Sequence, residues 1–98
     1  MIENVIWTKL AQKDFDAIIA YFKKEASEQV IDNFHQLLED KLQRLEKYPE
    51  SGRLVEVSRQ IYVINLDKYR QMFYRLNDKS LYISRFFDTR QNPDKRPY

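Results

Sequence analysis

The chain changes its hydrophobic period from helical to extended near Gly52, its single glycine. Before this point apolar residues recur every three or four positions over residues 9–25 and 28–47, which places them on one face of a helix. After it, β-branched and aromatic residues form three runs without helical spacing, over residues 59–66, 69–76 and 81–87. Such runs predict strands. The chain is therefore expected to fold as two amphipathic helices packed against a sheet.

Local signals set the boundaries of these elements. Thr8 and Ser27 are suited to cap the two helices, and residues 2–7 are typical of a short first strand. Residues 53–57 add an extended lead-in to the later strands, which short polar turns join as an antiparallel meander. The expected fold class is α+β, in the order strand-helix-helix-strand-strand-strand, with a helical hairpin packed on one face of a mostly antiparallel sheet.

Size and composition fit one domain over residues 1–98. The chain is 43% hydrophobic and 33% charged and contains no cysteine, so neither a disulfide framework nor a thiolate metal site can form. The first residues do not pattern as a signal peptide, and no apolar stretch approaches the roughly 20 residues of a membrane span. We therefore expect a cytoplasmic protein without membrane contact.

Strand alternation predicts which side chains share a face. In the run 69–76, Arg70, Met72, Tyr74 and Leu76 share one face, and in the last run the same holds for Leu81, Ile83, Arg85 and Phe87. The sheet face turned away from the helices is then expected to gather Arg59, Arg75, Arg85 and Arg90 beside tyrosines. Such a surface suits phosphates and bases. Cations at strand edges also discourage aggregation, which is the alternative explanation.

The two halves of the chain differ in charge. Residues 1–50 carry seven Lys and Arg against ten Asp and Glu, a net of −3, whereas residues 51–98 carry ten against five, a net of +5. This asymmetry indicates a surface on the second half that faces a polyanion, although chance scatter of solubilising charges explains it equally well.

Most catalytic chemistries lack the residues they need. His35 is the only histidine, Asp14 and Asp16 flank Phe15 on what is expected to be exposed helix surface, and one glycine cannot make a phosphate-binding loop. No metal or cofactor is expected. Metal-independent RNA cleavage remains open, because cations can stabilise the phosphorane and a tyrosine can supply a proton. Its candidate residues are Arg70, Arg75, Arg85, Arg90, Lys95 and Tyr98.

Three motifs, taken with the order of the elements, resemble the RelE/ParE superfamily of bacterial toxins. They are YPESGR at residues 48–53, YRQMFYR at 69–75 and FDTRQNP at 87–93. The resemblance covers essentially the whole chain. It implies the toxin of a type II toxin–antitoxin module, a plasmid stabilisation-like protein whose cognate antitoxin wraps around this domain and neutralises it.

The resemblance implies two mechanisms. RelE-like members cleave messenger RNA in the ribosomal A site, and Arg70, Arg90 and Tyr98 fall where these members carry functional residues. ParE-like members poison DNA gyrase instead. Some cleaving members place a histidine after the arginine at position 90, where this chain has Gln91, which cannot act as acid or base at pH 7. The ending therefore favours the gyrase mechanism.

Three hypotheses follow. The chain is a growth inhibitor that poisons gyrase, or a ribosome-dependent endoribonuclease on the same fold, or an inactive relative that only binds its antitoxin. Whether it is an enzyme stays open. The residues expected to bind the target, protein or nucleic acid, are Arg59, Arg75, Arg85, Arg90, Lys95 and Arg96.

Overall fold

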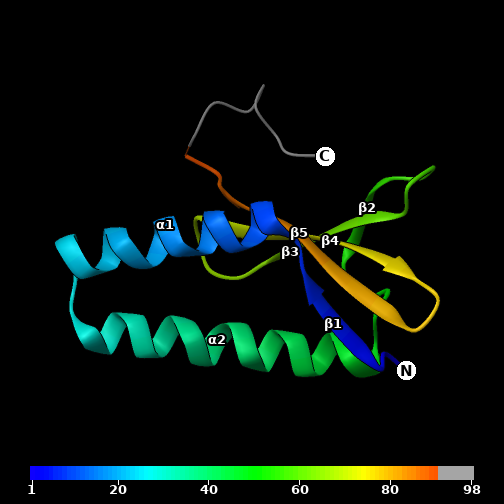
Figure 1. The fold of residues 1–98 in the computed structure, drawn as a ribbon, viewed down its shortest axis with the longest axis horizontal. Coiled ribbons are helices and arrows are strands. Elements are labelled where there is room, and N and C mark those ends of the chain that lie inside the picture. The colour runs from blue at the N-terminus through cyan, green and yellow to red at the C-terminus, as the bar shows by residue number, and fades with distance from the viewer. Residues whose placement is uncertain (91–98) are drawn as a thin grey trace.

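The computed structural model describes residues 1–90, and this part of the chain forms two helices and five strands (Figure 1). Their bounds are β1 Asn4–Trp7, α1 Lys9–Glu25, α2 Glu28–Lys47, β2 Arg53–Glu56, β3 Ile61–Asn65, β4 Arg70–Asn77 and β5 Ser80–Asp88. These elements confirm the predicted α+β order. The lead-in expected after Gly52 is strand β2, paired with β3.

Both helices begin at the residues predicted to cap them. The Thr8 hydroxyl oxygen accepts the amide of Ala11 at 3.1 Å, and the Ser27 hydroxyl oxygen accepts the amide of Val30 at 3.4 Å. The Thr8 hydroxyl also donates to the carbonyl oxygen of Ile83 at 2.9 Å. The cap of α1 therefore attaches this helix to β5. Figure 1 shows the two helices side by side, with their connecting turn at the end farthest from the strands.

The sheet has the strand order β1-β5-β4-β3-β2. The strands β2, β3, β4 and β5 pair antiparallel with their neighbours, whereas β1 pairs parallel with β5. The helical hairpin connects β1 to the rest of the sheet and lies across one of its faces (Figure 1). The sheet is thus mixed and mostly antiparallel, as expected.

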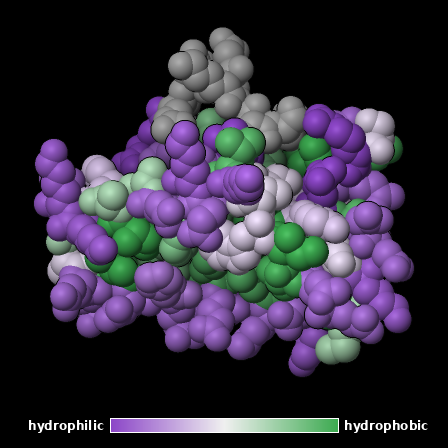
Figure 2. All heavy atoms as spheres, viewed as in Figure 1, coloured by the Kyte–Doolittle hydropathy of each residue, from purple (hydrophilic) through white to green (hydrophobic). Residues whose placement is uncertain are grey.

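A hydrophobic core fills the space between the helices and the sheet. Rings from four elements meet there: the centroid of Phe15 lies 5.3 Å from Trp7, 5.9 Å from Phe34 and 5.6 Å from Phe86. Each buried large side chain of this kind contributes about 1.5–3 kcal/mol. Figure 2 shows hydrophobic residues in the seam between the helices and hydrophilic ones on their outer sides.

A β-bulge in β5 overturns one predicted face. Phe73 pairs with Arg85 and Tyr74 pairs with Ile83, so Ser84 is an extra residue and the alternation reverses there. Up to the bulge the prediction is correct, because Leu81 and Ile83 lie in the helix-side core. Beyond it, Phe86 enters this core and Phe87 joins the opposite face. The predicted set that put Arg85 and Phe87 with Leu81 and Ile83 is therefore wrong.

The sheet face turned away from the helices carries a second apolar cluster. Its buried members are Ile61, Val63, Phe73 and Phe87, with Val55 packed against them. The centre of this face is therefore hydrophobic, and the strands do not form the basic surface that was expected across it. Arg75 does lie on this face, where it pairs with Ile61 of β3 and with Tyr82 of β5.

Candidate functional site

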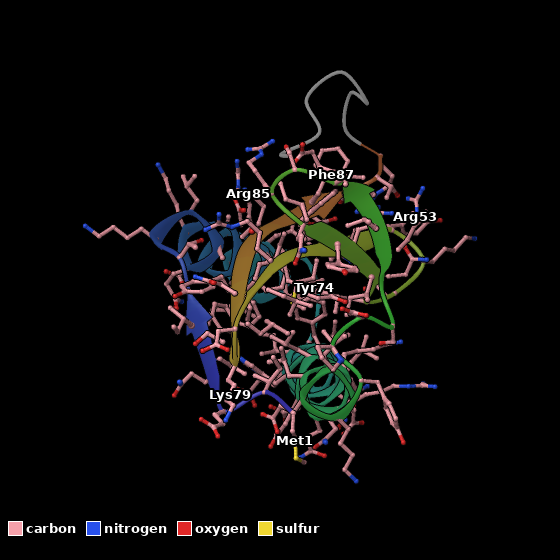
Figure 3. All side chains as sticks on the ribbon, turned by 90° about the vertical axis from the view of Figure 1, so that its right-hand side faces the viewer. Met1, Arg53, Tyr74, Lys79, Arg85 and Phe87 are labelled. Atoms are coloured by element: carbon pink, nitrogen blue, oxygen red, sulfur yellow. The ribbon has the colours of Figure 1, made fainter. Side chains whose placement is uncertain are left out.

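A hollow of about 770 Å³ lies between α1, the start of β4 and the end of β5. We call it the arginine hollow, since three of the arginines predicted as site residues line it. Its lining consists of Asp14, Ala17, Ile18, Tyr21, Arg70, Arg85, Phe86, Phe87, Asp88 and Arg90. Figure 3 shows Arg85 close to α1, whose Asp14 it contacts. The structure therefore brings Arg70, Arg85 and Arg90 to one place from two strands.

Arg70 is held in a fixed position at the base of the hollow. Its side chain is only 10% exposed, and its guanidinium lies 4.7 Å from the centroid of the Phe22 ring. One terminal nitrogen of that group is 3.4 Å from an Asp67 carboxylate oxygen, and the Arg70 amide donates to the same carboxylate at 2.8 Å. A cation against an aromatic face with a carboxylate partner is stable when partly buried.

Arg85 forms a two-bond ion pair with α1. Its Nε donates to one oxygen of Asp14 at 2.6 Å and its Nη2 donates to the other at 3.0 Å. These bonds to Asp14 raise the pKa of the Arg85 guanidinium above its ordinary value. The Asp14 carboxylate also accepts the amide of Phe86 at 3.1 Å. Asp14 thus joins α1 to both the side chain and the backbone of β5.

Arg90 stacks on a tyrosine at the mouth of the hollow. Its Nη2 and Nε donate to the two oxygens of Asp88 at 2.6 and 3.0 Å, and its guanidinium lies 4.5 Å from the centroid of Tyr69. The bond from the Arg90 side chain is the main reason that the pKa of Asp88 lies below its usual value, with a smaller contribution from the charge of Arg70. The Arg90 side chain remains 50% exposed, so a partner can reach it.

The charges of the arginine hollow are balanced from within the chain. Each of its three guanidinium groups has a carboxylate within 4 Å, supplied by Asp67, Asp14 or Asp88. Between these pairs lie apolar and aromatic side chains, among them the exposed Tyr21. Arginine beside tyrosine on an accessible surface is typical of the residues that dominate protein–protein contacts. The arrangement is less suited to a bare phosphate, because an anion must compete with a carboxylate for each arginine.

Two other predicted site residues, Arg59 and Arg75, do not line the hollow. Arg59 pairs with Glu56 at 3.1 Å beyond β2, and the guanidinium of Arg75 lies 5.7 Å from the centroid of Tyr82. Lys95, Arg96 and Tyr98, together with Gln91, lie outside the described residues. The predicted convergence of four arginines is therefore wrong for Arg59 and Arg75. Arg59 lies in the turn between β2 and β3, and Arg75 pairs with Tyr82 near the start of β5, whereas the hollow is at the end of β5.

Comparison with known proteins decides the family. The model of a family described as "ParE toxin of type II toxin-antitoxin system, parDE" matches residues 5–93. The chain belongs to the ParE toxin family. A search of curated protein sequences gives no significant match.

Solved structures support the fold of this ParE-family chain. A chromosomal ParDE toxin–antitoxin system from P. aeruginosa matches with a TM-score of 0.71 and 20% identity, over 89% of this chain and 96% of that one. A copper-bound mutant toxin from Helicobacter pylori matches with a TM-score of 0.64 and 16% identity, over 90% and 94% of the two chains. A toxin of this family has an antitoxin as its partner.

No metal cluster or membrane span is found in the described part of this ParE-family chain. Among residues 1–90, no three His, Asp or Glu side chains gather as metal ligands would, and neither helix is long and apolar enough to cross a bilayer. His35 is exposed on α2, with its ring 5.4 Å from that of Phe15.

Sequence reasoning missed the role of Asp14. The prediction of exposed helix surface is correct for Asp16, but Asp14 is half-buried and forms three hydrogen bonds to β5. One signal was available: Asp14 lies four residues from both Leu10 and Ile18, at the border of the apolar stripe of α1. Its partner could not be read from the sequence, because Arg85 is 71 residues away.

Proposed function

We propose that this ParE-family chain is a growth-inhibiting toxin that poisons DNA gyrase, and that the arginine hollow faces the target. The family match over residues 5–93 is the observation that carries the proposal. Gyrase acts in the cytoplasm, so the toxin acts there too. The antitoxin partner that the family implies keeps the toxin inactive until it is released.

The chemistry of the hollow supports a protein target. Tyr21 is 51% exposed, Tyr69 is 38% exposed, and the Arg90 guanidinium stacks on the Tyr69 ring. Aromatic and arginine side chains supply most of the binding free energy at protein interfaces, where each important one contributes at least about 2 kcal/mol. The preset ion pair between Arg90 and Asp88 limits the conformational entropy that binding costs.

Messenger RNA cleavage on the ribosome is the second candidate. It is favoured by the presence of Arg70 and Arg90 at one hollow, where cations could stabilise a phosphorane. Two observations favour gyrase over this reaction. Both arginines already have a carboxylate partner, and position 91 holds glutamine, which cannot transfer a proton at neutral pH.

Substitution of Arg90 tests the proposal. The wild-type chain, induced without its antitoxin, is expected to stop growth, and the purified chain with purified gyrase should yield cleaved plasmid DNA. Arg90→Ala should reduce both effects at least about tenfold, the loss expected for a residue that dominates an interface. Arg59→Ala is the matched control, because Arg59 also forms an exposed pair with a nearby carboxylate, outside the hollow.

Each other outcome identifies a different function. A fully toxic Arg90→Ala chain would show that the hollow does not face the target. If messenger RNA is cut at ribosomal A-site codons while plasmid DNA stays intact, the chain is a ribosome-dependent endoribonuclease and does not poison gyrase. If cells that express the wild-type chain grow normally, the chain is an inactive relative that only binds its antitoxin.

A further inference from the structure

A second cleft lies on the other side of the molecule, between the C-terminal half of α2 and the start of β2. Its volume is about 590 Å³. Its lining includes Lys41, Arg44, Leu45, Arg53, Ile64 and Asn65. We call this cleft the basic cleft. Figure 3 shows Arg53 and Arg85 toward opposite edges of the sheet, on β2 and β5, and the linings of the basic cleft and the arginine hollow share no residue, so the two are separate surfaces.

The cations of the basic cleft have no internal partners in the described structure. Lys41, Arg44 and Arg53 form no ion pair within residues 1–90, whereas all three arginines of the hollow do. No acidic residue is part of the cleft's described lining, and Glu50 in the preceding turn lies outside it. Three uncompensated cations around one cleft attract an anionic partner.

The floor of this cleft includes an unpaired strand edge. β2 begins at Arg53, opposite Val63, and its pairing with β3 goes no further toward Asn65. It cannot extend, because the Gly52 amide donates to the Tyr74 hydroxyl at 3.1 Å and the Ser51 amide donates to the Tyr48 carbonyl at 3.0 Å. The last residues of β3 therefore lack a strand neighbour on this side within residues 1–90.

The hydrogen-bond pattern of β3 orients this edge toward the cleft. The Leu66 amide donates to the Arg70 carbonyl oxygen at 2.8 Å, so Leu66 points its backbone groups toward β4. Successive residues of a strand point theirs to opposite sides. The amide and carbonyl of Asn65 therefore point outward, beside the half-buried Ile64, which offers an apolar contact. An extended segment that pairs with such an edge gains backbone hydrogen bonds, and adjacent pockets select its side chains.

We propose that the basic cleft binds an acidic, extended segment of the cognate antitoxin, which adds as a strand beside Asn65 and places carboxylates on Lys41, Arg44 and Arg53. This proposal rests on the family's antitoxin partner and not on gyrase as the target. A nucleic acid would use the three cations but leave the backbone of Asn65 unpaired, so the free strand edge favours a peptide.

A charge reversal in the cleft tests the proposal. The double substitution Lys41→Glu and Arg44→Glu is expected to raise the Kd for the cognate antitoxin roughly tenfold or more, because it places like charges against the antitoxin's carboxylates. The control is Lys23→Glu with Lys24→Glu, which makes the same change in net charge near the end of α1. It should change the Kd less than about threefold, as expected of exposed charges away from an interface.

Hydrogen exchange supplies an independent readout. The Asn65 amide should exchange in the free toxin and become protected in the toxin–antitoxin complex. An unprotected Asn65 in that complex, or equal Kd values for the two double variants, would overturn the proposal. Competition between a single-stranded oligonucleotide and the antitoxin, without protection of Asn65, would assign the cleft to nucleic acid instead. Gyrase cleavage is measured separately, so a failure of either proposal is seen on its own.

Discussion

Tyr74 shows how one residue connects the turn after α2 to the sheet. Its hydroxyl donates to the Pro49 carbonyl at 2.7 Å and accepts the Gly52 amide at 3.1 Å, while its buried ring stacks 5.3 Å from Tyr62. Position 52 requires glycine for steric reasons, since a Cβ there would lie 2.5 Å from the Tyr74 hydroxyl oxygen and 3.0 Å from the Val63 carbonyl. The single glycine of the chain therefore stands at a close approach of the turn to the sheet.

Tyr74→Phe should lower the free energy of unfolding by about 1–3 kcal/mol, because it leaves the Pro49 carbonyl and the Gly52 amide without this partner. Urea denaturation monitored by circular dichroism measures the change. Tyr82→Phe is the control, because its half-buried ring lies on the other face of the sheet. Equal losses in the two variants would mean that these hydrogen bonds contribute no stability of their own.

The same variant should change the dependence of stability on alkaline pH. Burial raises the pKa of Tyr74 from 10.0 to about 12. The neutral phenol is therefore favoured in the folded state, and its contribution is present below pH 10 and lost as the pH rises toward 12. Between these values the wild type should lose about 2 kcal/mol more than Tyr74→Phe. Parallel pH profiles for the two proteins would contradict this assignment.

At the scale of elements, α1 takes the place of a strand along half of β5. β1 pairs only with Ser80 to Ile83, so among residues 1–90 no strand pairs with the later residues of β5 on that side. Thr8 and Asp14 bind this edge, through the carbonyls of Ile83 and Ser84 and the amide of Phe86. A helix that covers a strand edge protects it from pairing with another chain.

Asp14→Ala should therefore destabilise the fold by roughly 2–3 kcal/mol, because it removes charge-assisted bonds and leaves the Phe86 amide without its partner. Thermal unfolding and exchange of the Phe86 amide measure the effect. Asp16→Ala is the matched control, since Asp16 is exposed and its bond is to the Gln12 side chain on the same helix. If both variants melt at the same temperature, Asp14 does not secure the edge of β5.

At the scale of the whole molecule, ion pairs within the fold decide which cations are left without a carboxylate partner, and the charge balance of the sequence does not show this. The second half of the chain is the basic half, but most of its described arginines form ion pairs within the fold. The uncompensated cations of the basic cleft come from α2 in the acidic half and from Arg53. A prediction from the charge of the second half alone therefore omits Lys41 and Arg44, the two cations that α2 contributes to this cleft.

The separation of the two surfaces predicts that toxicity and neutralisation can be lost independently. Arg90→Ala should lose growth arrest yet keep its antitoxin affinity within about threefold, as for additive, distant sites. The double variant Lys41→Glu and Arg44→Glu should arrest growth even when the antitoxin is co-expressed at a level that neutralises the wild type. Growth assays with titrated antitoxin expression, together with Kd measurements, test both. Joint loss of the two properties in either variant would mean that the surfaces overlap or are coupled.

The sequence by itself determined the elements and their order, because hydrophobic period, helix caps and turn residues are local signals, and its three short motifs indicated the family by resemblance. Even the faces of β4 followed from simple alternation. Only the tertiary structure decided which arginines meet, since one extra residue at Ser84 reverses the faces of β5 and Asp14 meets Arg85 across 71 positions. The same holds for the basic cleft, whose cations and strand edge come together only through packing. Contacts between distant segments depend on how the whole chain packs, and no local pattern encodes them.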